Sequence, residues 1–408
     1  MTSEGPTVAH VTPWYLPHIG GLERHVEAIV DGLPLFGSLI LTPHMPGTPS
    51  NETHDGLIRI QRFGPPKFPP EGGPKPFAAP RDWVARFARL GNLRGALRSN
   101  RFDILHVHRP PMIELAYLAA KRGENVPLQR LARRLNRLPN AGMPQVLTDH
   151  GLFILPSSTS PLDLRWFMEW VLEEYDHVIC VDPSGFARAA AIRDSNPGRF
   201  STVEIHHIPQ PIDTNAFRPA PMPDTKDLIV GYSGRWQRDG MFLLEALVMS
   251  RPQGMRFIVS GGATPRDMEW YAPSLKRVAV DLRPNLLDIE DLIRFYHDID
   301  VLVDFYRGDG CGRSVLEAMA CGRAVVRIRS RDTHPIVDGV TGILTDPTSA
   351  SIQATLADLA IHRWRVEELG RRARESVEQE YGLAHVLKQI QAIYRRCLQL
   401  RRPSKRSA

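Results

Sequence analysis

One alternation of short apolar runs with helical stretches occurs twice in this chain, once on each side of the proline-rich segment 209–223. Short apolar runs of this kind are typical of strands in a parallel sheet that is covered by helices on both faces. The expected strands are 7–12, 38–42, 103–107, 145–148 and 177–181, followed by 228–232, 256–260, 300–303, 324–327 and 342–344. The pattern predicts an α/β chain with two Rossmann-like, doubly wound parallel sheets.

The length of the chain also indicates two domains. Its 408 residues exceed one ordinary core and fit two domains of about 200 residues each. The expected boundaries are 1–215 for the first domain, 224–382 for the second, 383–400 for a helix that crosses back to the first domain, and 401–408 for a basic tail. Segment 64–76 is rich in proline and is expected to be a surface loop. Ligands of such domains bind at the carboxyl ends of the strands, here in a cleft between two facing sheets.

Two carboxylates lie eight positions apart across a Gly-X-Gly turn, at Asp309 and Glu317. Gly310 and Gly312 permit a tight turn, and 314–320 is a helix-forming stretch. Backbone N–H groups at a helix N-terminus suit an anionic or hydroxyl-rich ligand. We therefore predict a sugar-nucleotide site, in which Glu317 accepts two ribose hydroxyls and Asp309 contacts the sugar.

Segment 309–322 resembles the glycine-rich E-G-F-G-x-x-x-L-E-A-M-A-x-G block of the retaining family-4 glycosyltransferases (glycosyl transferases group 1). Other segments resemble that family's motifs in the expected order. They are 18–26, 103–108, 148–151, 208–219, 234–235 and 340–344. The resemblance covers nearly the whole chain and implies the two-domain GT-B fold.

The resemblance also implies a set of site residues. The expected catalytic residues are Asp309, His150 and Arg235. The expected donor-binding residues are Glu317, Gly20, Gly21, Arg238, Leu286, Gly310, Cys311, Gly312, Ser314 and Val315. Arg235 would neutralise the diphosphate of the leaving nucleotide, and main-chain groups near Leu286 would contact the base. His106 and His108, in contrast, are expected to be packed core residues.

The chain departs from the family pattern at several of these positions. Asp239 stands where the family has a lysine that partners the arginine on the diphosphate, so Arg238 is the nearest substitute cation. Asp309 replaces a glutamate, Cys311 replaces a phenylalanine, and Gln210 begins the dipeptide that is usually Asn-Gly. These differences are compatible with an altered donor, with a second cation supplied elsewhere, or with a decayed catalyst.

The implied reaction moves a sugar from a UDP-, GDP- or ADP-sugar to a hydroxyl acceptor with retention of anomeric configuration. No enzymic nucleophile is expected, because a β-phosphate oxygen can take the acceptor proton. A metal is not expected to be required, and the spacing of residues shows no metal-ligand cluster. Two other interpretations remain open: a sugar-nucleotide epimerase or phosphorylase on the same fold, and a degenerate, non-catalytic sugar-nucleotide binding protein.

Segment 123–143 carries leucines at helical spacing opposite arginines. The leucines are Leu128, Leu131, Leu135 and Leu138, and the arginines are Arg130, Arg133, Arg134 and Arg137. Such a basic amphipathic helix docks on an anionic membrane or on a partner, or else covers the protein's own core.

Net charge, hydropathy and cysteine spacing indicate the partners and the cellular compartment to expect. The net charge of +6 favours diphosphate or anionic lipid as a partner, and no nucleic-acid motif is present. No apolar run reaches the ~20 residues of a bilayer span, and the four cysteines lack C-x-x-C spacing. We expect a cytoplasmic protein with reduced thiols, either soluble or peripheral at the inner face of the membrane.

Overall fold

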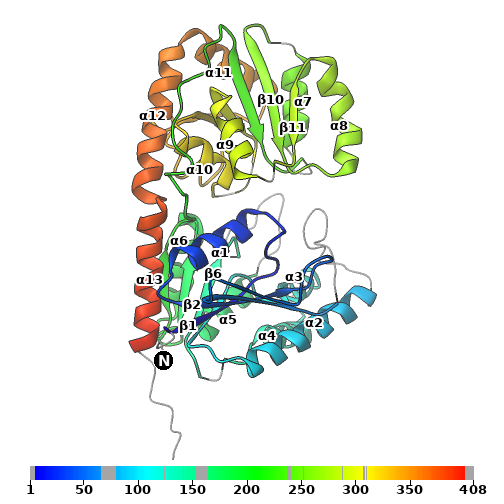
Figure 1. Cartoon of the computed structure of the whole chain (residues 1–408), viewed down its shortest axis with the longest axis vertical. Helices are drawn as coiled ribbons and strands as arrows, with labels where there is room; N and C mark the ends of the chain where they lie inside the picture. The colour runs from blue at the N-terminus through cyan, green and yellow to red at the C-terminus, as the bar shows by residue number, and fades with distance from the viewer. Residues whose placement is uncertain are drawn as a thin grey trace, which may run out of the picture. The chain divides into compact units, whose positions relative to one another are not determined.

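The computed structural model describes two compact units, Met1–Pro209 with Val386–Ala408, and Gln210–His385 (Figure 1). The described residues are 5–65, 80–123, 125–140, 142–152, 164–236, 240–250, 252–286, 288–306, 308 and 310–399. Among the helices in these ranges, none combines the length and the apolar character needed to span a lipid bilayer.

The described part of the first unit contains an eight-stranded sheet with the order β3-β4-β2-β1-β5-β6-β7-β8. The strands are β1 (Thr7–Val11), β2 (Gly37–Pro43), β3 (Asn51–His54), β4 (Ile58–Phe63), β5 (Ile104–Val107), β6 (Gln145–Asp149), β7 (His177–Cys180) and β8 (Glu204–His207). All neighbours pair in parallel except β3 and β4, which are antiparallel. Every residue of β5, β6 and β7 is buried, as expected for strands covered on both faces.

The helices of the first unit follow the strands along the chain. They are α1 (Gly21–Gly32), α2 (Pro80–Ser99), α3 (Ile113–Lys121), α4 (Val126–Asn136), α5 (Arg165–Glu174), α6 (Pro183–Ser195) and α13 (Leu383–Gln399). From Val386 onward, α13 belongs to this unit although it is last in the sequence. Its Tyr394 hydroxyl lies 2.6 Å from Nδ1 of His106 in β5, and Arg396 forms an ion pair with Glu204 of β8 at 2.9 Å.

The described part of the second unit contains a six-stranded, wholly parallel sheet with the order β11-β10-β9-β12-β13-β14. Its strands are β9 (Leu228–Ser233), β10 (Met255–Gly261), β11 (Asp281–Pro284), β12 (Val301–Asp304), β13 (Ala324–Ile328) and β14 (Ile343–Thr345). Its helices are α7 (Gly240–Met249), α8 (Pro265–Arg277), α9 (Ile289–His297), α10 (Arg313–Ala320), α11 (Ser349–Ile361) and α12 (Arg363–Glu380).

The predicted class of two parallel α/β sheets is confirmed, and the ten predicted strands each lie within one or two residues of an observed one. Strands β3, β4, β8 and β11 were not predicted from the sequence. These four include both edges of the first sheet and one edge of the second, where polar residues are tolerated. The surface loop predicted for 64–76 lies largely outside the described residues.

The leucine face of segment 123–143 packs against the core of its own unit. Leu128 and Leu135 of α4 contact the core cluster, and Leu138, just beyond the helix, is 4% exposed. Leu131 is exposed. The structure therefore favours the alternative in which this helix covers the protein's own core.

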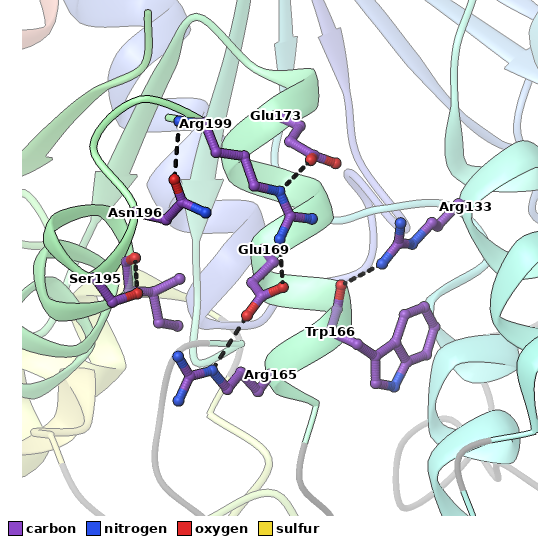
Figure 2. Close-up of polar contacts among 9 residues, drawn as sticks. Arg133, Arg165, Trp166, Glu169, Glu173, Ser195, Asn196 and Arg199 are labelled. Carbon is purple, nitrogen blue, oxygen red and sulfur yellow. Dashed lines mark hydrogen bonds and ion pairs between the residues drawn. The ribbon is translucent and has the colours of Figure 1, made fainter. Parts of the chain in front are cut away.

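Two arginines of this segment bind residues of the neighbouring helix α5. Arg133 donates to the Trp166 carbonyl at 3.2 Å and lies over the indole ring (Figure 2). Arg137 donates to both carboxylate oxygens of Glu174. These contacts fix α4 to α5, so that two of the four arginines already have protein partners.

Candidate functional site

The glycine turn after β12 leads directly into α10. Gly310 has a φ of +81°, a conformation that side-chain-bearing residues rarely adopt, whereas Gly312 is the N-cap of α10 with an ordinary φ of −71°. The Val315 N–H donates back to the Gly312 carbonyl at 3.1 Å, and Cys311 and Ser314 are partly exposed. The turn therefore needs glycine at Gly310 for its backbone. The predicted sugar-contacting Asp309 lies outside the described residues.

Glu317 is held by two neighbouring side chains inside the second unit. The hydroxyl of Tyr296 donates to its Oε2 at 2.9 Å, and Nε of Arg313 lies 3.3 Å from its Oε1. Glu317 is only 4% exposed. Burial, and then the Glu317 charge, hold the pKa of Tyr296 well above its ordinary value, so this phenol stays a donor. A carboxylate has about four lone-pair positions, so two donors leave acceptor capacity for a ligand.

Neither partner of Glu317 was predicted as a site residue. Arg313 precedes Glu317 by four positions, a spacing that places two side chains on one helix face, and this signal could have been used. Arg313 also donates to the Pro211 carbonyl at 3.1 Å. Tyr296 comes from α9, and no local pattern links it to α10.

Arg327 is a second residue that the sequence did not single out. It lies in β13, and its side chain is fully buried. Its Nε is 3.4 Å from Oδ2 of Asp304 at the end of β12, and its Nη2 donates to the Gly308 carbonyl at 3.0 Å. A buried guanidinium therefore ties the start of the glycine turn to the sheet. Arg327 was not predicted as a site residue because the strand around it is otherwise apolar.

Arg235 follows β9 at a closely packed corner of the second unit. The neighbouring Trp236 is buried, with its indole N–H donating to the Ser260 carbonyl at 2.9 Å. A Cβ on Gly261 would lie 1.9 Å from the Gly234 carbonyl oxygen, so these two backbones can approach only because Gly261 is glycine. Arg235 itself is exposed. An anchored backbone therefore presents this guanidinium outward, while the nearby Arg238 and Asp239 lie outside the described residues.

Several of the predicted donor-binding residues thus follow strands that end at the same edge of the second sheet. Arg235 follows β9, Leu286 follows β11, and Gly310 and Gly312 follow β12. In a parallel sheet these strand ends share one edge, which is where ligands of doubly wound sheets bind. Leu286 is partly buried against the core of this unit. Arg235, and the helix that carries Glu317, therefore follow strands whose carboxyl ends share one edge of this sheet.

Gly20 and Gly21 begin α1 in the first unit, but a carboxylate lies beside them. A Cβ on Gly20 would lie 2.5 Å from Oε2 of Glu23, and Nδ1 of His18 is 3.1 Å from Oε1 of the same glutamate. Glu23 is buried. A negative charge at this helix start disfavours a phosphate and suits a hydroxyl-bearing ligand. The sequence analysis did not identify Glu23 as part of this site.

His150 directly follows β6, and Gly151 turns the chain after it with a φ of +110°. Its ring centroid lies 4.7 Å from that of His25 and 6.3 Å from that of His108. Burial lowers the pKa of His150 to about 4, so its imidazole is neutral near pH 7. The prediction that His106 and His108 are core residues is confirmed, since both are at most 1% exposed.

The fold also brings together a group of histidines that the sequence analysis did not anticipate. One ring nitrogen from each of His25, His108 and His150 lies within 4.8 Å of the others. These residues come from three separate segments, so no local spacing in the sequence marks them as a metal-ligand cluster. The arrangement has the residue types of a transition-metal site.

Family comparisons agree with this fold. Residues 19–216 match the model for Glycosyltransferase Family 4, and residues 227–361 match the model for Glycosyl transferases group 1. The chain belongs to the family-4 glycosyltransferases and is a glycosyltransferase of the GT-B fold class.

Individual proteins show how far this likeness extends. Alpha-maltose-1-phosphate synthase of Mycolicibacterium smegmatis is 26% identical over 337 residues, which cover 67% of this chain and 85% of that protein. Sucrose-phosphate synthase from Thermosynechococcus elongatus has a TM-score of 0.71 at 17% identity, covering 97% of this chain and 100% of the other. Anabaena HepE in complex with UDP-glucose has a TM-score of 0.65 at 15% identity, covering 96% and 99%. The two structures show a shared fold.

Proposed function

We propose that this protein is a retaining glycosyltransferase that moves a sugar from a nucleotide-sugar donor to a hydroxyl acceptor. The observation that carries the proposal is Glu317, a buried carboxylate held in place by Tyr296 and Arg313 within the helix that follows the glycine turn. Two fixed donors preorganise this acceptor, so a ribose diol would meet it without reorganisation of the protein. A solvated loop carboxylate would have no such support.

The charges at the same edge of the second sheet suit a leaving nucleoside diphosphate. Arg235 would stabilise the negative charge that develops on the diphosphate, and the N–H groups at the start of α10 would add to this effect. Asp309 would contact the donor sugar. The β-phosphate oxygen would take the proton of the attacking hydroxyl on the face that the nucleotide leaves, which gives retention. No bound metal is needed in this scheme.

We assign the binding of the hydroxyl acceptor to the first unit. His150 is a neutral imidazole near pH 7 and so can exchange hydrogen bonds with sugar hydroxyls. Gly20 and Gly21 lie beside the Glu23 carboxylate, so we assign them to a hydroxyl acceptor rather than to the diphosphate. HepE, a structural relative, was solved with UDP-glucose, and a UDP-sugar is therefore the first donor to test.

Attachment to an anionic membrane remains a proposal for segment 123–143. The leucines that would enter lipid are packed inside, apart from Leu131. Any attachment would therefore depend on exposed arginines and would be weakened by salt. Co-sedimentation with anionic and neutral vesicles at low and high salt measures it directly.

A panel of UDP-, GDP- and ADP-sugars, each with and without hydroxyl acceptors, tests the proposed activity. We expect acceptor-dependent release of one nucleoside diphosphate and a product with the anomeric configuration of the donor, which NMR of the anomeric proton reports. An inverted product would contradict the mechanism. An isomerised sugar would indicate an epimerase, and binding without turnover a non-catalytic protein.

A further inference from the structure

Five histidines form a buried cluster in the first unit: His10, His25, His106, His108 and His150. The first four are at most 1% exposed. The rings of neighbouring members contact one another, with centroids 4.2 Å apart for His106 and His108 and 5.4 Å for His10 and His108. They come from β1, α1, β5 with the residue after it, and the residue that follows β6, so the cluster is a product of the fold. Burial lowers the pKa of His10 to about 3 and of His150 to about 4, so these two imidazoles are neutral near pH 7.

The hydrogen bonds of this cluster divide it into two parts. His106 is fully engaged, with the Tyr394 hydroxyl 2.6 Å from Nδ1 and the Thr148 hydroxyl 2.8 Å from Nε2. His108 has His10 at 3.1 Å from its Nε2, whereas its Nδ1 is buried without a hydrogen-bond partner among the described residues. Nε2 of His150 is likewise buried without a hydrogen-bond partner among the described residues. Such unpaired buried nitrogens are uncommon and point to a missing ligand.

We propose that His25, His108 and His150 form a binding site for a divalent transition metal of the Zn²⁺ class. Neutral imidazole is the usual histidine ligand for this class of metal. One ring nitrogen of each residue already lies within 4.8 Å of the others. Zn–N bonds of about 2.0–2.1 Å in a tetrahedral site require nitrogens about 3.3 Å apart, so the three rings would move inward by small rotations.

His10 is placed as a supporting residue for this site. When Nε2–H of His108 donates to Nδ1 of His10, the lone pair of His108 is on its unpaired Nδ1. Metal-binding histidines are commonly oriented in this way by a hydrogen bond from the second nitrogen. Three protein ligands leave a fourth position open, and His150, the least buried of the three ligands, marks where solvent reaches it.

Two other groups in the first unit are poorer candidates for the same metal. In the group His10, His106 and His108, the nitrogens of His106 are already hydrogen-bonded. The group His177, Glu204 and His206 is elsewhere in the unit, and its Glu204 is paired with Arg396 at 2.9 Å. This second group is a useful control, because it has two histidines of its own whose Nδ1 (His177) and Nε2 (His206) already lie 3.2 Å apart as a hydrogen-bonded pair.

Metal binding would also act on the proposed glycosyl transfer. His150 is a residue that we assign to sugar hydroxyls, so a metal on its ring would compete with a sugar for that ring. We therefore expect micromolar-range inhibition by Zn²⁺ that a chelator reverses. This consequence rests on the proposed function, whereas the metal site itself can be tested without any activity.

The test uses full-length protein after chelator treatment. Calorimetry with Zn²⁺ should show one site, and Co²⁺ should give the visible absorption of a tetrahedral nitrogen-ligated ion without the thiolate charge-transfer band. His25→Gln and His108→Gln should each weaken binding by more than tenfold, and His10→Gln by about 10- to 100-fold as a supporting residue. The control variant His177→Gln/His206→Gln should bind as the wild type does.

Each result decides for or against the site. No Zn²⁺ binding, binding unchanged in His25→Gln and His108→Gln, or binding lost in the His177→Gln/His206→Gln control would each overturn the proposal. Circular dichroism identifies any variant that fails to fold. His25 lies on a helix, where glutamine is well tolerated, so His25→Gln keeps the test decisive if His108→Gln does not fold. Metal binding without inhibition would leave the site standing and count against the role of His150 in transfer.

Discussion

Glu317→Gln removes the charge of one carboxylate while keeping its size. The wild-type group accepts from the Tyr296 hydroxyl at 2.9 Å and lies 3.3 Å from Arg313 Nε. The amide retains one acceptor oxygen, but its NH₂ group faces a donor. The substitution therefore weakens both the support of the helix and the acceptor that we assign to ribose.

The two effects have different expected sizes. A hydrogen bond to a charged group contributes about 1.5–3 kcal/mol, so the free energy of unfolding should fall by about that amount. Loss of charge-assisted bonds to ribose should weaken nucleoside diphosphate binding by about 10- to 100-fold, since each tenfold change corresponds to about 1.4 kcal/mol. The protein should remain folded at 25 °C.

Tyr296→Phe is the matched control because it removes the other partner of the same hydrogen bond. It should lower the free energy of unfolding by about 1–3 kcal/mol, through the buried oxygen of Glu317 that it leaves unpaired. It keeps the carboxylate, so the Kd for the nucleotide should change by only a few-fold.

Denaturant unfolding and calorimetric titration with UDP, GDP and ADP separate the two effects. Equal nucleotide affinity in Glu317→Gln and the wild type, together with lower stability, would refute the ribose assignment and leave Glu317 a structural residue. Equal losses of affinity in Glu317→Gln and Tyr296→Phe would show that helix placement, and not the charge, controls binding.

Four further predictions concern charges in the two units. Arg235→Ala should lower kcat by ~10²- to 10³-fold in a steady-state assay with the identified donor, because the guanidinium stabilises a developing diphosphate charge; a change below twofold would contradict this. Asp239→Lys should tighten nucleoside diphosphate binding in calorimetry, and weaker binding would mean that the loop differs from that of its relatives. Arg327→Ala should reduce the free energy of unfolding by about 3–5 kcal/mol, because it leaves Asp304 without its buried partner; a loss below 1 kcal/mol would exclude that pairing. The contribution of His150 to the free energy of unfolding should be fully present above pH 6.5 and should fall by roughly 3 kcal/mol as the pH drops toward 4, because His150 is protonated near pH 6.5 in the unfolded chain but only near pH 4 in the folded one. Urea unfolding of wild type and His150→Gln across this range should show a smaller pH dependence in the variant.

Ten of the strands could be located from the sequence because local patterns mark them. Mostly apolar runs such as β5 and β13 predict buried parallel strands, and the glycine turn before α10 marks a helix start. The edge strand β8, Glu-Ile-His-His, carries no such pattern, since a strand with one neighbour need not be apolar.

The supporting residues of the site were harder to predict because their partners are distant in the chain. Tyr296 reaches Glu317 across 21 positions, and His108 lies beside His25 and His150 only after the sheet has formed. Local periodicity reports which face of an element is buried, but not which polar side chains meet there. Arg327 is the sharpest case: a charged residue within an apolar strand pattern is a local conflict, and such conflicts tend to mark functional or strained positions. Here the charge of Arg327 is matched by Asp304 and by the Gly308 carbonyl. Both lie beside the glycine turn that was predicted to bind the donor. A charged residue in an otherwise apolar strand is therefore a signal that could have added Arg327 to the predicted site residues.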